Sequence, residues 1–283
     1  MANVSMLRLD QLGGEAPGNK SFKLKGYVAE AERLGIGRLV SFGGAWSNHL
    51  HALAATGVQY GLETVGIVRG ESTEAPTAML ADAKRWGMNI VHLSRSEYRL
   101  RNEPDYLSEL NERFSPCLVI PEGGAAFLGA QHCREIAELL EQADAARKVV
   151  LPVGTGTTLA GLVAALDGES QVIGISALKG ALDLEMRVQS LLEELSPKNS
   201  ASWTINHDYH CGGFARTNAQ LREFVLQFEA CQNILLDPVY TAKMLYGIAQ
   251  LQAGGDWDAT SPVLAIHTGG LQGRRGYGWL DKP

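Results

Sequence analysis

The sequence predicts an α/β protein with two open, twisted and mostly parallel sheets, each covered by helices on both faces. Short β-branched runs alternate with segments of helical period along the chain. The 283 residues are 45% hydrophobic and 20% charged, which is enough to bury one large or two smaller cores. The strand and helix units are too many for one comfortable doubly wound sheet. We therefore expect two domains with a cleft between them.

Seven runs have the composition of buried parallel strands, with Val, Ile and Leu in close succession. In chain order they are 38–42, 64–68, 89–93, 117–120, 149–153, 172–175 and 263–266. Apolar stripes of helical period stand between them. Leu24, Tyr27, Val28 and Ala31 recur at i, i+3, i+4 and i+7, and similar stripes span 75–86, 128–140 and 221–228. Each such helix can cover one face of a sheet.

Composition and charge exclude several classes of function. Lys and Arg total 25 against 31 for Asp and Glu, without a dense basic run, so a nucleic-acid partner is not expected. No segment has the apolar length of a membrane span, and the first residues lack an export leader. Four widely spaced cysteines, without a C-x-x-C pair, suggest neither a disulfide framework nor a metal site. We expect a soluble, cytoplasmic protein.

A glycine-rich loop at 154–158 follows an apolar strand and precedes a helical stretch at 159–166. It consists of Gly154, Thr155, Gly156, Thr157 and Thr158. Backbone N–H groups that converge at a helix N-terminus bind phosphate, although a tight turn with a Thr cap is an equally simple interpretation. A dinucleotide site is disfavoured because Leu159 and Ser176 stand where a third glycine and an acidic residue belong. A single phosphate monoester on a small cofactor fits better.

Two other segments lie where a turn or strand gives way to a helix. Lys20 follows Gly18 and Asn19, and by itself such a lysine is most often a solvated surface charge. Ser47 and Asn48 follow a pair of glycines, so they can seat a carboxylate or simply cap the helix. Neither segment identifies an activity on its own.

Taken together, five segments resemble the fold-type II pyridoxal-phosphate enzymes, and within them the family of 1-aminocyclopropane-1-carboxylate deaminase and D-cysteine desulfhydrase. That family has G-N-K-x-x-K-L, G-G-x-x-S-N-[HQ], G-[ST]-T-x-A-G, D-P-V-Y and H-x-G-G in this order. The matching segments here are 18–24, 43–49, 156–161, 237–240 and 267–270. They span nearly the whole chain.

The resemblance implies a tryptophan synthase β-like fold with the cofactor, pyridoxal 5′-phosphate, in the interdomain cleft. The large domain would consist of residues 1–24 and 127–283, and the small domain of residues 25–126. Lys20, rather than Lys23, would hold the cofactor as a Schiff base because it directly follows the Gly-Asn pair. The phosphate would lie on the loop from Gly154 to Thr158.

The remaining site residues also come from the resemblance. Asn48 would contact the 3′ oxygen of the cofactor, and Ser47 would lie near the substrate carboxylate or the reacting carbon. Tyr240 would line the substrate side. Thr241 would face the pyridine nitrogen, where the cyclopropane deaminase carries a glutamate.

The implied function is a lyase or deaminase that converts a small amino acid to a keto acid and ammonia. A neutral Thr241 makes the ring a weaker electron sink, which favours rapid loss of a β-leaving group, as in D-cysteine desulfhydrase. Phe214 stands where the family has an active-site tyrosine, so cyclopropane deamination is not expected unless Tyr209 reaches the same place. The family also implies a homodimer.

Two alternatives stay open. A racemase or dehydratase on the same scaffold could use Ser47 as a second acid. A catalytically silent cofactor-binding member is suggested by Phe214 and by the short segment before Lys20, which could lack an outer strand or a dimer contact.

Overall fold

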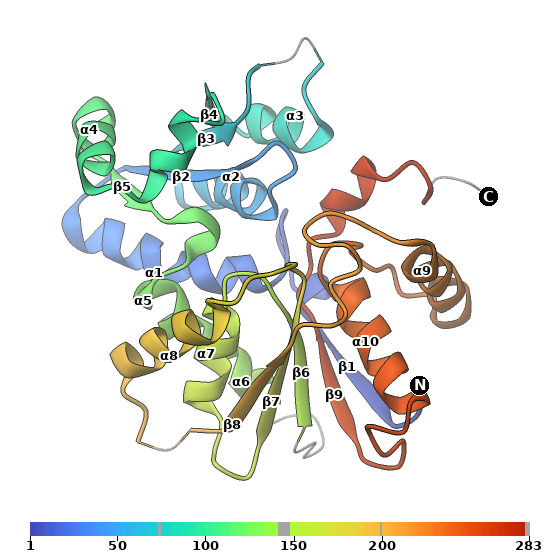
Figure 1. Ribbon diagram of the computed structural model, residues 1–283. Helices are drawn as coiled ribbons and strands as arrows, with labels where there is room; N and C mark the ends of the chain where they lie inside the picture. Colours follow the sequence, from blue (N-terminus) through green and yellow to red (C-terminus); the bar gives the residue numbers. More distant parts are fainter. Residues whose placement is uncertain (73–74, 141–147, 199, 281–283) are drawn as a thin grey trace.

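Two parallel sheets form the frame of the protein. The computed structural model describes residues 1–72, 75–140, 148–198 and 200–280 (Figure 1). The larger sheet has five strands in the order β1-β9-β6-β7-β8, and the smaller has four in the order β4-β3-β2-β5. Neighbouring strands of both sheets are parallel throughout the described residues. The predicted α/β fold with two sheets is confirmed.

All seven predicted strands are present. The larger sheet contains β1 (Val4–Arg8), β6 (Lys148–Val153), β7 (Gln171–Ser176), β8 (Ser202–Asn206) and β9 (Val263–His267). The smaller contains β2 (Arg38–Gly44), β3 (Glu63–Arg69), β4 (Asn89–Leu93) and β5 (Leu118–Ile120). Only β1 and β8 were not predicted, and both are edge strands of the larger sheet. An outer strand is therefore present ahead of Lys20, and the expectation that it could be missing is wrong.

Helices cover both sheets. They are α1 (Asn19–Leu34), α2 (Asn48–Tyr60), α3 (Ala78–Arg85), α4 (Pro104–Phe114), α5 (Phe127–Cys133), α6 (Glu135–Leu140), α7 (Thr157–Ala165), α8 (Leu184–Leu195), α9 (Ala219–Gln232) and α10 (Thr241–Ala253). Short 3-10 turns are η1 (Leu9–Gln11), η2 (Glu97–Asn102), η3 (Glu122–Gly124) and η4 (Leu271–Gly276). The stripe at 128–140 is two helices, α5 and α6, which meet at Arg134. Within the described ranges, no helix has the length and apolar character needed to cross a membrane.

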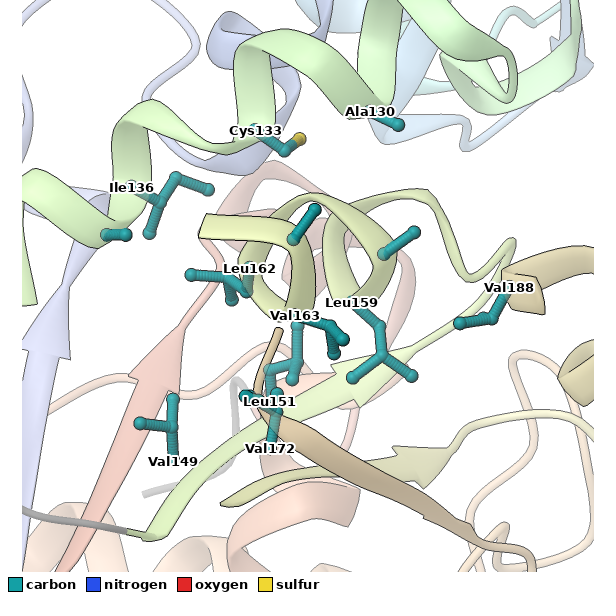
Figure 2. Close-up of a cluster of buried hydrophobic side chains, with 14 of the residues drawn as sticks. Ala130, Cys133, Ile136, Val149, Leu151, Leu159, Leu162, Val163, Val172 and Val188 are labelled. Carbon is teal, nitrogen blue, oxygen red and sulfur yellow. The ribbon is translucent and has the colours of Figure 1, made fainter. Parts of the chain in front are cut away.

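The larger sheet buries side chains on both faces. Successive residues of a strand point to opposite faces, so Val149 and Val150 belong to different cores. Figure 2 shows one core, in which Leu159 and Leu162 of α7 lie over β6. On the other face, α9 and α10 pack against β6, β7 and β9. This double coverage explains the near-continuous apolar strands of the sequence.

Helix α1 joins the two halves of the fold, and it runs between the two sheets in Figure 1. Phe22 belongs to a core of the larger sheet, whereas Leu24 and Tyr27 belong to a core of the smaller one. Gly26 allows close contact with α5, because a Cβ there would lie 2.6 Å from the Leu128 carbonyl oxygen. The division into residues 1–24 with 127–283 and residues 25–126 remains a proposal; the change of core along α1 supports a boundary near residue 24, with Leu24 itself on the side of the smaller sheet.

Candidate active site

Four helix N-termini meet between the two sheets. Helices α1, α2, α7 and α10 begin at Asn19, Asn48, Thr157 and Thr241. The Asn19 side chain joins α1 to α7, since its Nδ2 donates to Thr158 Oγ1 at 2.9 Å. Because each helix has a partial positive charge at its N-terminus, their convergence favours an anionic ligand.

The glycine-rich loop presents free backbone donors at the start of α7. Gly156 is the N-cap with φ of +83°, a left-handed conformation that glycine adopts readily, and no side chain caps the helix. The interpretation as a Thr-capped turn is therefore wrong. The Thr155 and Thr157 hydroxyls lie 2.9 Å apart, while Thr158 is held by Asn19. The first N–H groups of α7 remain available for a phosphate.

Lys23 lies directly on this loop. Its Nζ donates to Thr155 Oγ1 and to the Gly123 carbonyl oxygen, both at 3.2 Å, and the residue is only 3% exposed. Burial, followed by repulsion from Lys20, lowers the pKa of Lys23 to about 7. Sequence reasoning placed no role on Lys23, although its spacing of three from Lys20 puts both on one helix face.

Lys20 lies one turn before Lys23 and is much less engaged. It is half-buried, and its Nζ reaches only its neighbour Asn19, whose Oδ1 lies at 3.3 Å. Burial lowers the pKa of Lys20, and the negative charge of Asp237 acts in the opposite direction. Among the described residues, no carboxylate forms an ion pair with it. A lysine with a lowered pKa and an unoccupied amine is suited to covalent chemistry with a carbonyl.

Ser47 and Asn48 share the start of α2. Ser47 is the N-cap, and its Oγ accepts from the Leu50 N–H at 3.2 Å, so its own hydroxyl proton is left to donate. Asn48 Oδ1 accepts from Gln272 Nε2 at 2.5 Å. His49 is turned away to Ser41, with 2.8 Å between Nε2 and Oγ. The described part of the chain contains no group of three His, Cys, Asp or Glu that could hold a metal ion.

Tyr240 and Thr241 stand at the start of α10. The Tyr240 ring covers Gly154, where a Cβ would lie 3.0 Å from the ring. Thr241 is 0% exposed, and its Oγ1 has no hydrogen-bond partner among the described residues. A buried hydroxyl without a partner costs free energy unless a ligand completes it. An aromatic ring nitrogen is such an acceptor, so the buried hydroxyl fits a pyridine ring at this place.

Tyr209 does not supply the hydroxyl that the family pattern places at Phe214. Phe214 is 53% exposed, contacts the Tyr240 ring at a centroid distance of 6.2 Å, and lines a cavity of about 620 Å³. Tyr209 packs instead against Tyr246 and Gly247, in the middle of α10. It therefore does not replace the missing hydroxyl beside Phe214.

The chain is similar to known proteins in both sequence and fold. A curated relative from Pyrococcus abyssi, named "Putative 1-aminocyclopropane-1-carboxylate deaminase", is 29% identical over 288 residues, which cover 98% of this chain and 87% of that protein. The solved structure of an ACC deaminase homologue superposes with a TM-score of 0.86 at 24% identity, covering 99% of this chain and 89% of its own.

Serine racemase from Dictyostelium discoideum shares the fold at a TM-score of 0.66 and 17% identity, with 95% of this chain and 87% of that chain covered. The predicted fold-type II architecture is thus confirmed. A family model described as "Pyridoxal-phosphate dependent enzyme" matches residues 6–269, a span that includes both lysines, the glycine-rich loop and the start of α10. By this match the chain belongs to the family of pyridoxal-phosphate dependent enzymes.

Proposed function

We propose that this chain is a lyase or deaminase that acts on a small amino acid and holds pyridoxal phosphate through Lys20. The observation that carries the proposal is the pair of lysines on one face of α1. Lys23 is bound to the glycine-rich loop, and Lys20 has an amine that the protein leaves nearly unused. We infer that Lys23 binds a phosphate and that Lys20 reacts with an aldehyde.

Each part of the cofactor has a protein group suited to it. The phosphate would be bound by the backbone of residues 154–158 and by Lys23, and the 3′ oxygen by Asn48 Nδ2. Thr241 Oγ1 would donate to the pyridine nitrogen, and Tyr240 would form a wall of the site. When bound, pyridoxal phosphate supplies an aldehyde for covalent attachment and a ring that withdraws electrons from the substrate α-carbon.

The protein's own groups would then handle protons and orientation. The lowered pKa of Lys20 increases the uncharged fraction of its amine, which can accept the proton of the substrate α-carbon at Nζ. The Ser47 hydroxyl can donate to the substrate carboxylate. Thr241 is neutral, so it does not enforce protonation of the ring nitrogen, and this favours substrates with a good β-leaving group.

The direct test is release of keto acid and ammonia from amino acids with β-leaving groups. D-cysteine and β-chloro-D-alanine are expected to yield pyruvate, whereas 1-aminocyclopropane-1-carboxylate should yield no 2-oxobutanoate because Phe214 carries no hydroxyl. Turnover of the cyclopropane substrate alone would contradict the proposal. If the protein binds the cofactor but no amino acid changes its absorption, the catalytically silent alternative is favoured.

Racemisation is a second candidate function, favoured by the free proton of Ser47 Oγ. A racemase must protonate the α-carbon from the face opposite the lysine. Chiral analysis of an unreacted amino acid in D₂O separates the two functions. Racemase activity predicts deuterium in both enantiomers, and loss of that exchange in a Ser47→Ala variant. A lyase that lacks racemase activity leaves the remaining substrate in its original configuration.

The pKa of Lys23 predicts how phosphate binding depends on pH. A bound phosphate dianion stabilises the Lys23 ammonium and raises its pKa above the value of about 7 in the free protein. Above pH 7, binding must take up about one proton, so affinity should fall by about tenfold per pH unit. Below pH 7 this group contributes no dependence.

Calorimetric titration with 4′-deoxypyridoxine phosphate measures this effect without chemistry at Lys20, because the ligand has no aldehyde. Titrations in buffers of different ionisation enthalpy report the proton uptake directly. A Lys23→Met variant should bind more weakly and lose the pH dependence above 7. An unchanged pH profile in that variant would remove Lys23 from the phosphate site.

We also propose a cytoplasmic homodimer, as the family resemblance implies. The four cysteines are free, and Cys133 and Cys211 are buried, which supports a reducing compartment. Light scattering of the purified protein tests the dimer, and a monomer at micromolar concentration would reject it.

A further inference from the structure

The start of α2 is held by a residue from the far end of the chain. Gln272, in η4, donates from Nε2 to Asn48 Oδ1 at 2.5 Å and to the Trp46 carbonyl oxygen at 3.3 Å. Both acceptors lie on the small-sheet side of the site, whereas η4 follows β9 of the larger sheet. Gln272 thus bridges the two halves of the protein at Asn48.

The backbone carbonyl of Trp46 determines the orientation of the Gln272 and Asn48 side-chain amides. The Trp46 oxygen can only accept, so the Gln272 atom facing it must be the NH₂ group. The Gln272 oxygen is in turn 3.4 Å from a donor, Arg275 Nη2. The Asn48 atom that meets the Gln272 NH₂ group must then be its oxygen. Gln272 therefore determines which end of the Asn48 amide faces the site.

The nitrogen of the Asn48 side-chain amide is the end that Gln272 does not contact. Its Nδ2 has no acceptor in the part of the chain that the structure describes, and Gly270 makes room for it. A Cβ at Gly270 would lie 2.5 Å from Asn48 Nδ2. The same space is bordered by Asp237, whose Cγ would lie 3.6 Å from that Cβ. Asn48 Nδ2 thus lies against Gly270, and its two N–H donors are unused by the described residues.

We propose that Gln272 is a positioning residue for the cofactor: it fixes the Asn48 amide so that Nδ2, and not Oδ1, meets the cofactor's 3′ oxygen. The inference rests on the proposed function, because it needs pyridoxal phosphate in this site. A reversed amide would set the Asn48 oxygen against a phenolic oxygen, and a hydrogen bond to a charged group would become a repulsion.

The test is a Gln272→Glu variant, which replaces the NH₂ group by an oxygen of the same shape. The new carboxylate favours the Asn48 nitrogen, so the amide reverses and presents its oxygen to the cofactor. Pyridoxal phosphate should bind about tenfold or more weakly, and the absorption maximum of the bound cofactor should shift, since its 3′ oxygen loses a donor. Equilibrium dialysis and visible spectroscopy give both values without an activity assay.

A double-mutant cycle separates positioning from a general effect on the fold. In an Asn48→Ala background, Gln272→Glu should change cofactor affinity by less than about twofold, because no amide is left to orient. Equal losses in both backgrounds would overturn the proposal. Gln272→Leu removes the amide without adding a charge. If this variant had the cofactor affinity and spectrum of the unmodified protein, the proposal would also be overturned.

Asp82→Ala is the matched control, because Asp82 accepts another contact of this segment with the smaller-sheet half and does not touch Gln272. Its Oδ2 in α3 lies 2.6 Å from Arg275 Nη2. Loss of this ion pair should leave the cofactor spectrum unchanged, and the same shift as in Gln272→Glu would mean that domain contact alone is responsible. If the unmodified protein bound no pyridoxal phosphate, the proposed function itself would fail, a result distinct from failure of Gln272.

Discussion

Replacement of Lys20 by Ala is expected to abolish covalent attachment of pyridoxal phosphate. On one face of α1, Lys23 is buried and Lys20 is half-buried, but only Lys20 has an amine without a strong partner. Attachment needs an uncharged amine, and burial lowers the pKa of Lys20 toward that state. Borohydride reduction followed by peptide mapping of the unmodified protein should find the pyridoxyl group on Lys20, and the variant should carry none.

Lys23→Ala is the matched control, since it removes an amine one turn away on the same helix face. This variant should keep the covalent bond at Lys20 and lose roughly 10- to 100-fold in affinity, as expected for loss of a charged hydrogen bond to phosphate. A pyridoxyl group on Lys23, or attachment that persists in Lys20→Ala, would exchange the roles of the two lysines.

In the larger sheet, the strands buried on both faces were predictable from the sequence, and the two edge strands were not. The run at 149–153 is apolar throughout because helices cover both faces of β6. In β1, Ser5 and Arg8 interrupt the apolar pattern, since this strand pairs with β9 on one side only. β8 was not predicted because its apolar pattern is weak in the same way. Local composition reports burial: neither β1 nor β8 contains a fully buried residue, whereas the predicted edge strands β4 and β5 of the smaller sheet contain one each.

In the site, segments that lie near one another along the chain were predictable, and contacts between distant segments were not. The glycine-rich loop stands out because it lies at a turn before a helix, and Lys20 was singled out by the family resemblance. Lys23 and Gln272 do not stand out, since their partners Thr155 and Asn48 are far away in sequence. Nor does any sequence pattern show that the Thr241 hydroxyl is buried without a partner among the described residues.

Asp237→Ala is expected to lower the free energy of unfolding by about 2–4 kcal/mol, because three backbone donors, two of them fully buried, would lose their acceptor. Asp237 is 0% exposed, and its carboxylate accepts from the N–H groups of Val239, Tyr240 and Thr241 at 3.2, 2.7 and 3.2 Å. These bonds fix the turn that leads into α10. Urea unfolding of the cofactor-free protein measures the loss.

The pH dependence of stability offers a second test of the same carboxyl group. Burial raises the pKa of Asp237 from its ordinary value of 3.8 to about 6, against backbone hydrogen bonds that lower it. Between these values the folded state binds a proton that the unfolded state does not. The contribution of Asp237 to stability is therefore complete below pH 3.8 and declines as the pH rises through 6. Asp237→Asn should remove this decline, because an amide does not titrate.

Asp258 provides the control, because it accepts hydrogen bonds in a turn, as Asp237 does, but is not buried. Its carboxylate accepts from the N–H and hydroxyl of Thr260 at 2.8 and 2.7 Å, but the residue is exposed. Water replaces the carboxylate in Asp258→Ala, so the unfolding midpoint should hardly change. Cofactor affinity distinguishes the two positions further, because Asp237 also orients Tyr240 and Thr241. Both substitutions could lower the free energy of unfolding equally. In that case, burial of the N–H groups that donate to Asp237 would contribute nothing beyond an ordinary turn.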